Sequence, residues 1–351
     1  MKIKLLPRMR AVLLCLLAVA LLCPGVGATA LPPDTEPATD VVLPGGFPFG
    51  VKFTTNGVLI VGFCDIDVGG KAQNPAKSAG LKIKDILTHV NGEALEDAAA
   101  LTRAIDAAGG KPVTLIYRRG DKCNTATLTP LPDPATGGYK TGLYVRDSGA
   151  GIGTVTFVLP QNHAFAGLGH GICDVDTGEL MPIERGTVVD VTVSGVNRGL
   201  PGSPGEIKGY FGTGKTGTLL GNTPCGVFGL YAETPAALTD EKPIAVGKRE
   251  EVHEGDATIC CTLGSNERRT YSARITNIDR SAHGSKCFAV RITDPALLEE
   301  SGGIVQGMSG SPILQDGKII GAVTHVLIND PSAGYGIFID NMLASMPDLL
   351  K

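Results

Sequence analysis

The sequence contains no tryptophan, and Phe, Trp and Tyr together make up only 5% of its 351 residues. It also lacks a block of basic residues, and its formal net charge is −4 at pH 7. Proteins that bind nucleic acids need a concentrated basic surface, often with aromatic side chains on which bases stack. These two shortages exclude DNA and RNA as the expected partners.

Low-complexity and disordered chains are excluded as well, because 43% of the residues are hydrophobic. Glycine is abundant instead, with 48 residues, which is about twice its ordinary share. A glycine content of this kind predicts many tight turns. At about 150 residues per domain, the length predicts two domains, each with its own core.

Long apolar runs are absent except at the N-terminus, where Ala11–Cys23 forms a run of 13 residues. A bilayer span needs about 20 apolar residues. Four basic residues precede the run, and Pro24 and a stretch of small residues follow it. This order is typical of a secretory signal. We therefore expect residues 1–30 to be a cleaved signal peptide, or a signal anchor whose retention would keep the protein at the membrane, and residues 31–40 to be a linker.

The cysteines give no sign of a metal site, because no C-x-x-C pair occurs. Seven cysteines follow residue 30, namely Cys64, Cys123, Cys173, Cys225, Cys260, Cys261 and Cys287. An odd number in an exported chain leaves at least one thiol outside any internal disulfide. His170 and Cys173 have the spacing of half a zinc site, but no second cluster completes it. We expect neither a metal nor a cofactor.

Turn signals divide the rest of the chain into two domains. Residues 41–131 read as a compact α+β domain with strands at Val58–Phe63, Ile86–Val90 and Pro112–Arg118 and a helix at Leu95–Ala108. A second linker is expected at 132–140. Residues 141–351 consist of short alternating strands with glycine-rich turns, the pattern of a β-sandwich or barrel. Examples are Thr154–Leu159, Thr187–Val193, Thr270–Ile275, Phe288–Ile292 and Ile319–Leu327.

The segment Ser78–Gly92 resembles the core of a PDZ domain, whose pattern is AGL-x-x-GD-x-I-x-x-VNG, with Lys84 in place of the glycine. In PDZ domains a peptide adds as a strand beside a helix, and backbone N–H groups of a glycine-containing loop hold its carboxylate. The resemblance implies that Leu95–Ala108 is the groove helix. It also implies that Gly45–Val51 is the loop, with Phe49, Gly50 and Val51 as peptide-binding residues.

A nucleophile motif lies near the C-terminus. Gly307–Pro312 has the form G-x-S-G-x-P, which surrounds the reactive serine of chymotrypsin-like peptidases. Its glycines allow a tight turn that exposes the Ser309 hydroxyl and aims backbone N–H groups at a developing oxyanion. We predict Ser309 as the nucleophile and the N–H groups of Gly307 and Ser309 as the oxyanion hole.

A serine nucleophile needs a general base, and His170 is the best placed of six histidines because glycines flank it in Ala166–Ile172. His325, by contrast, lies in an apolar strand and reads as a structural histidine. A carboxylate should orient the base. Phe288, Val290 and Ile292 alternate on one strand face, and Asp294 continues that face. We predict Asp294 as the acid, with Asp174, Asp176 and Asp190 as alternatives.

A competing motif, Gly209–Thr216, fits the phosphate-binding pattern G-x-x-x-x-G-K-[ST]. A phosphate-binding loop must be followed by a helix. The next residues, GTLLGNTP, form a poor helix. We interpret this segment as a glycine-rich β-turn.

Three longer motifs are Gly142–Thr154, Gly167–Gly171 and Gly302–Ile313. They resemble the SpoIVB peptidase family, the stage IV sporulation protein B of endospore formers. The order of export signal, PDZ domain and peptidase domain is also similar over nearly the whole chain. The resemblance implies an α+β PDZ domain followed by a mainly-β, chymotrypsin-like double-barrel peptidase domain over 141–351, with His170, Asp294 and Ser309 as its triad.

The resemblance further implies a function. A family member is secreted into the space between forespore and mother cell, where it cleaves itself and a regulatory protein of the membrane-bound complex that processes pro-sigma-K. Its PDZ domain helps to recognise both targets. The alternative is a catalytically silent PDZ adaptor that binds protein tails in the envelope. The motifs at Ser309 and His170 favour the enzyme, because an adaptor needs neither.

Overall fold

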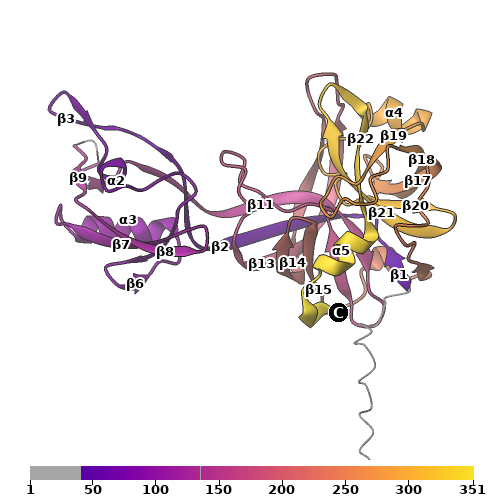
Figure 1. Ribbon diagram of the computed structural model, residues 1–351, viewed down its shortest axis with the longest axis horizontal. Coiled ribbons are helices and arrows are strands. Elements are labelled where there is room, and N and C mark those ends of the chain that lie inside the picture. Colours follow the sequence, from indigo (N-terminus) through magenta and orange to yellow (C-terminus); the bar gives the residue numbers. More distant parts are fainter. Residues whose placement is uncertain (1–40, 135) are drawn as a thin grey trace, which may run out of the picture. The chain divides into compact units, whose positions relative to one another are not determined.

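The computed structural model describes residues 41–134 and 136–351 (Figure 1). The predicted signal and the first linker lie outside these residues. Among the helices that it describes, none has both the length and the apolar character needed to cross a bilayer.

The first barrel closes through six paired strands: β2 (Pro48–Phe63), β11 (Leu143–Val158), β12 (Ala164–Gly167), β13 (Ile183–Asn197), β14 (Glu206–Thr223) and β15 (Gly226–Tyr231). They follow the order β11-β12-β15-β14-β13-β2, and pairing of β2 with β11 completes the ring. Buried and exposed side chains alternate along β2, as the arrangement requires. Phe49, Val51 and Phe53 are buried inside, whereas Lys52 and Thr54 between and beside them are exposed.

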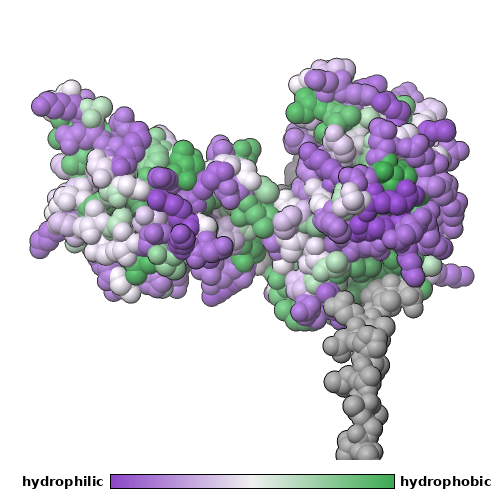
Figure 2. All heavy atoms as spheres, viewed as in Figure 1, coloured by the Kyte–Doolittle hydropathy of each residue, from purple (hydrophilic) through white to green (hydrophobic). Residues whose placement is uncertain are grey.

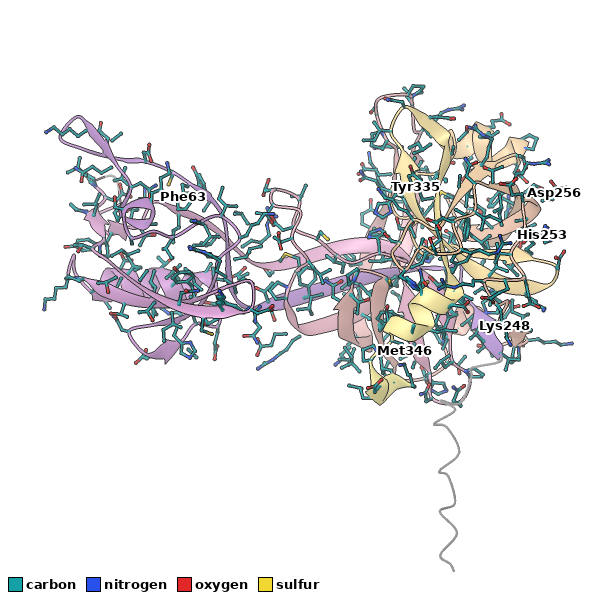
Figure 3. All side chains as sticks on the ribbon, viewed as in Figure 1. Phe63, Lys248, His253, Asp256, Tyr335 and Met346 are labelled. Atoms are coloured by element: carbon teal, nitrogen blue, oxygen red, sulfur yellow. The ribbon has the colours of Figure 1, made fainter. Side chains whose placement is uncertain are left out.

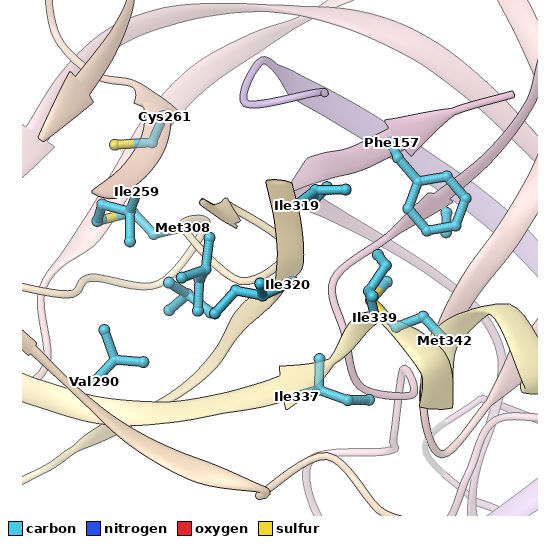
Figure 4. Packing of buried hydrophobic residues seen from close by; sticks show 14 of the residues in the cluster. Phe157, Ile259, Cys261, Val290, Met308, Ile319, Ile320, Ile337, Ile339 and Met342 are labelled. Atoms are coloured by element: carbon cyan, nitrogen blue, oxygen red, sulfur yellow. The ribbon is translucent and has the colours of Figure 1, made fainter. Parts of the chain in front are cut away.

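The second barrel consists of β17 (Gly255–Thr262), β18 (Arg268–Thr276), β19 (Phe288–Ile292), β22 (Asp330–Phe338), β21 (Lys318–Leu327) and β20 (Pro312–Gln315), in that closed order. Two helices accompany it, α4 (Pro295–Ser301) and α5 (Ile339–Ser345). Figure 4 shows its packed interior, where Ile259, Val290 and Met308 lie. The same hydrophobic cluster includes Phe157 of β11 and joins the two barrels.

The PDZ domain has a third core of its own. The second half of β2 pairs with β5 (Ile86–Val90), and the sheet continues through β7 (Val113–Arg119) and β8 (Lys122–Leu128). Helix α3 (Ala98–Ala107) begins at Asp97, whose side chain accepts the Ala100 N–H at 2.6 Å. It buries Leu101 and Ile105 in this core. The domain is therefore inserted between β2 and β11 of the first barrel.

The remaining elements are short. They are β1 (Val41–Pro44), β3 (Ile66–Val68), β4 (Lys71–Gln73), α2 (Pro75–Ser78), β6 (Glu93–Ala94), β9 (Leu131–Pro132), β10 (Tyr139–Lys140), η1 (Ala236–Leu238), β16 (Ile244–Ala245) and η2 (Asp348–Leu350). On the face shown in Figure 2, hydrophilic residues cover much of the two barrels. The structure confirms the predicted order of a PDZ-like α+β domain and a mainly-β part, which consists of two barrels.

Two predicted boundaries are wrong. β1 and the first half of β2 belong to the first barrel and not to a PDZ domain over 41–131. The predicted linker at 132–140 instead contains the β9–β10 pair, and the Tyr139 N–H donates to Asp106 of α3 at 2.8 Å. The first error arises because the partners of β1 and β2 follow the insertion in sequence. The second arises because the proline and glycines of 132–140 lie in a turn between paired strands and not at a domain end.

The predicted PDZ loop is also wrong. Phe49, Gly50 and Val51 lie within β2, and each pairs with β11 on one side and with β13 on the other. Phe49 and Val51 are almost fully buried in the first barrel. A strand that is hydrogen-bonded on both edges cannot hold a peptide carboxylate. The competing phosphate-binding motif at Gly209–Thr216 lies within β14, with no helix after it.

This insertion leads to a prediction about which parts fold alone. Thr54 pairs with Ser148, so the strands can be rejoined by replacing residues 56–146 with an Asn-Gly turn. We expect this shortened chain to fold, because both barrels keep every strand. A fragment of residues 138–351 should not fold, because it lacks β2 and leaves β11 and β13 without their partner.

Thermal unfolding followed by circular dichroism tests both variants. A single cooperative transition is expected for the hairpin-closed chain and none for the fragment. A well-folded fragment would contradict the placement of β2 in the first barrel.

Candidate active site

The turn that carries Ser309 lies between α4 and β20. Gly307 and Gly310 have φ angles of 97° and 95°, in the region that favours glycine. A side chain at Gly310 would also overlap the carbonyl of Thr154. The Ser309 hydroxyl donates to the carbonyl oxygen of Thr324 at 2.7 Å.

Strand β11 of the first barrel holds this turn by hydrogen bonds. The Thr154 N–H donates to the Ser309 carbonyl at 3.0 Å, and the Thr154 hydroxyl donates to the Gly307 carbonyl at 2.7 Å. The Thr156 hydroxyl holds the Gly310 carbonyl at 2.8 Å. The position of Ser309 beside one barrel therefore depends on a strand of the other.

Two backbone N–H groups of the turn are available to a ligand. Among the described residues, neither the Gly307 N–H nor the Ser309 N–H donates to a protein acceptor. Both residues line a cavity that also contains His170. These are the two donors that the sequence predicts for the oxyanion hole.

His170 follows β12, in a bend where Leu168 and Gly169 have φ angles of 65° and 66°. Its Nδ1 lies 2.9 Å from the carbonyl oxygen of Gly171. A donor at Nδ1 fixes the tautomer whose Nε2 can accept a proton. Burial lowers the pKa of His170 below its ordinary value, only partly offset by the Gly171 carbonyl.

A cavity of about 590 Å³ brings His170 and Ser309 together. Its walls come from both barrels. Apolar side chains dominate the lining and include Val51, Phe53, Ile152, Leu168, Ile172 and Met181. Arg146 and Asp174 contribute charges at this cavity. The cavity could hold a peptide segment with an apolar side chain.

The structure does not bring Asp294 to this cavity. Its carboxylate accepts the N–H groups of Ala296, Leu297 and Ser272 at 3.0 to 3.2 Å. Asp294 thus caps the N-terminus of α4. The assignment of Asp294 as orienting acid is wrong in this geometry, because β19 ends at Ile292 and the strand alternation does not reach residue 294.

The alternative acids also have other partners. Asp174 pairs with Arg146 and accepts bonds from Thr177, and Asp176 contacts the same guanidinium at 2.8 Å. Burial alone would raise the pKa of Asp174, but the Thr177 and Arg146 contacts together lower it. Asp190 lies on β13 at a second cavity. Within the described residues, the Gly171 carbonyl is therefore the group that orients His170.

His325, which the sequence predicts to be a structural histidine in an apolar strand, lies beside His170. Its ring centroid lies 4.8 Å from that of His170. The pairing of β21 with β22 shifts between Val323 and Val326, so Thr324 and His325 form a bulge. Burial, with His170 and Lys286 nearby, lowers the pKa of His325 to about 4. A bulge beside the nucleophile depends on tertiary pairing, and the local sequence carries no signal for it.

Among the described residues, no group of three His, Cys, Asp or Glu side chains is arranged to hold a metal ion. The seven cysteines are all free thiols in the structure. Burial raises the pKa of Cys261 well above its ordinary value.

Comparisons with known proteins agree with this architecture. The SpoIVB peptidase S55 family matches residues 137–343, and a PDZ domain family matches residues 66–119. No curated protein matches the chain.

Several solved structures are similar to parts of the chain. The active form of the Rv3671c protease from M. tuberculosis is 15% identical, with a TM-score of 0.33 over 56% of this chain and 73% of that one. The HtrA-type protease AlgW with decapeptide is 11% identical, with a TM-score of 0.33 over 56% of this chain and 52% of that one. The PDZ domain of the SdrC-like protein from Listeria monocytogenes is 24% identical, with a TM-score of 0.22 over 26% of this chain and 90% of that one.

The capping role of Asp294 gives a testable prediction. Asp294→Asn keeps a side-chain oxygen at the N-cap, so both stability and the rate of active-site labelling should stay close to wild type. Asp294→Ala removes the cap and should cost about 1 kcal/mol of unfolding free energy. Denaturant unfolding and the labelling rate of Ser309 by a fluorophosphonate measure the two effects. A labelling rate that falls by orders of magnitude in a fully stable Asp294→Asn chain would show that the carboxylate serves catalysis.

Proposed function

This chain belongs to the SpoIVB peptidase S55 family, and on that basis we propose that it is a self-cleaving serine endopeptidase. It is a serine peptidase with a PDZ domain. The observation that supports endopeptidase chemistry is the shared cavity, where Ser309 and His170 meet two unpaired N–H groups.

The proposed reaction starts with a rotation of the Ser309 hydroxyl away from the Thr324 carbonyl. His170 Nε2 takes the hydroxyl proton as the oxygen attacks the scissile carbonyl. The Gly307 and Ser309 N–H groups stabilise the oxyanion. His170 then passes the proton to the leaving amine, and an acyl-enzyme remains. Water activated by the same histidine hydrolyses that ester.

The proposed place of action is the space between the forespore and mother-cell membranes. The basic and apolar order of residues 1–30 supports export. The proposed substrates are the protein itself and a regulatory protein of the membrane-bound complex that processes pro-sigma-K. Cleavage of that regulator would trigger pro-sigma-K processing during sporulation.

Replacing the nucleophile tests the proposal. Ser309→Ala should abolish fluorophosphonate labelling and lower self-cleavage by about a million-fold, because the reaction loses its attacking atom. Ser311→Ala is the matched control. Ser311 is fully buried and donates to the Met308 carbonyl at 2.7 Å, so its loss should affect stability and leave labelling in place.

Labelling and processing are followed by gel and mass spectrometry on purified chains. Unchanged processing in Ser309→Ala would reject the peptidase proposal and favour the silent PDZ adaptor.

The pH dependence of the rate gives an independent test. A general base must be neutral, and the pKa of His170 lies below its ordinary value of 6.5. The labelling rate should therefore rise with pH through a midpoint below 6.5 and stay level above it. His253→Gln is the control, because His253 is exposed beside Asp316 on the second barrel. A midpoint clearly above 6.5, or one that moves in His253→Gln, would contradict the assignment of His170.

A further inference from the structure

The place where a PDZ domain takes its peptide is already filled in this structure. A PDZ ligand adds as an antiparallel strand between one strand and one helix. Here the strand is the second half of β2, which ends at Phe63 (Figure 3), and the helix is α3. One edge of this strand pairs with β5. The other edge pairs with the first residues of β11.

The pairing has the antiparallel direction of a bound peptide, and its register shifts by one residue between Tyr144 and Val145. Leu143 lies opposite Phe63, Tyr144 opposite Gly62, Val145 opposite Ile60 and Arg146 opposite Leu59, all antiparallel. β11 also contacts α3. Residues 143–147 thus form a docked segment on the PDZ sheet.

Alternate side chains of the docked segment face the groove. Leu143 and Val145 are half-buried and pack against the cluster that contains Leu101 and Ile105 of α3. Tyr144, between them, points away and is 58% exposed. Two apolar anchors separated by one outward residue are what a strand added beside a helix presents.

Both ends of the docked segment are fixed by hydrogen bonds. The carbonyl of Gly142 accepts from Cys64 N–H and from the Asn74 side chain, each at 3.0 Å. At the other end, the Asp147 carboxylate accepts the Ala98 N–H at the start of α3, at 2.8 Å.

The same strand continues into the active site. Arg146 pairs with Asp174 at the catalytic cavity, and residues 148–153 line that cavity. Thr154 then holds the carbonyls of Gly307 and Ser309. A change in the docked segment is therefore transmitted along one continuous strand to the nucleophile turn.

We propose that the docked segment is a built-in ligand of the PDZ groove, which keeps the groove closed to other peptides until it is displaced. The docked state accompanies a resting active site, because the Ser309 hydroxyl is held by Thr324 and not by His170. Displacement releases residues 143–147 from the groove, while the rest of β11 stays in the barrel, and raises the reactivity of Ser309. This last step rests on the proposed peptidase function, whereas occupancy of the groove does not.

The binding test uses a fluorescent peptide that copies residues 140–148. It is titrated into the full chain carrying Ser309→Ala, which prevents cleavage. The chain with its own segment docked should bind weakly. Leu143→Asp and Val145→Asp together should expel the segment, because docking would then bury two charges in an apolar groove. The peptide should bind this double-aspartate chain at least about 30-fold more tightly.

Tyr144→Asp is the control, because it adds a carboxylate to the exposed face of the same strand. It should leave peptide binding weak. A folded double-aspartate chain that binds the peptide no more tightly than the unaltered chain would overturn the proposal. If that chain shows no cooperative thermal transition, Leu143→Ala with Val145→Ala replaces it and is judged by the same comparison.

The coupling test measures fluorophosphonate labelling in chains that keep Ser309. The chain with Leu143→Asp and Val145→Asp should be labelled about fivefold faster than the Tyr144→Asp chain. Equal rates would reject the coupling between the groove and the nucleophile. Absence of labelling in every chain, with the binding difference intact, would instead reject the proposed peptidase function.

Discussion

The antiparallel pairing of β2 with β11 is the contact on which both domains depend. It extends from Pro48 opposite Thr154, inside the first barrel, to Phe63 opposite Leu143, inside the PDZ domain. At the barrel end it closes the ring of strands and places Thr154 against the nucleophile turn. At the other end it fills the edge of the PDZ sheet. Removing the pairing would open the barrel and expose backbone donors and acceptors in both domains.

The turn that carries Ser309 is held by backbone geometry more than by charge. Glycines at 307 and 310 adopt φ angles that other residues rarely reach, and threonine hydroxyls of β11 bind the carbonyls of the turn. This leaves the Gly307 and Ser309 N–H groups free for a substrate. His170 is likewise oriented by a backbone carbonyl and not by a carboxylate. A neutral acceptor stabilises an imidazolium less than an anion does, which suits a histidine whose pKa is already lowered by burial.

Much of this architecture can be predicted from local sequence. The motifs around Ser309 and His170 identify two residues of one cavity, and period-two alternation predicts β5 and β19 to the residue. Asp294 was misassigned because alternation describes a strand only while the strand lasts, and Pro295 marks a helix start. A capping aspartate and a catalytic one have the same local pattern.

Long-range pairing accounts for the remaining errors. Phe49 and Val51 precede the PDZ core in sequence but pack in the first barrel, because their partners Gly153 and Gly151 lie after the insertion. His325 reaches His170 through a bulge set by β22. In both cases the decisive neighbour is distant along the chain, and periodicity in one segment holds no information about it.

The inserted domain also has a consequence for the order of folding. Thr55 and Asp147, which meet where the barrel strands enter the PDZ domain, are 92 positions apart. Closing an unstructured loop of that length costs on the order of 4 kcal/mol in chain entropy. A PDZ domain that has already folded holds the two strands side by side and removes this cost before the barrel closes. An inserted domain that folds first therefore favours closure of the barrel by bringing its two strands together.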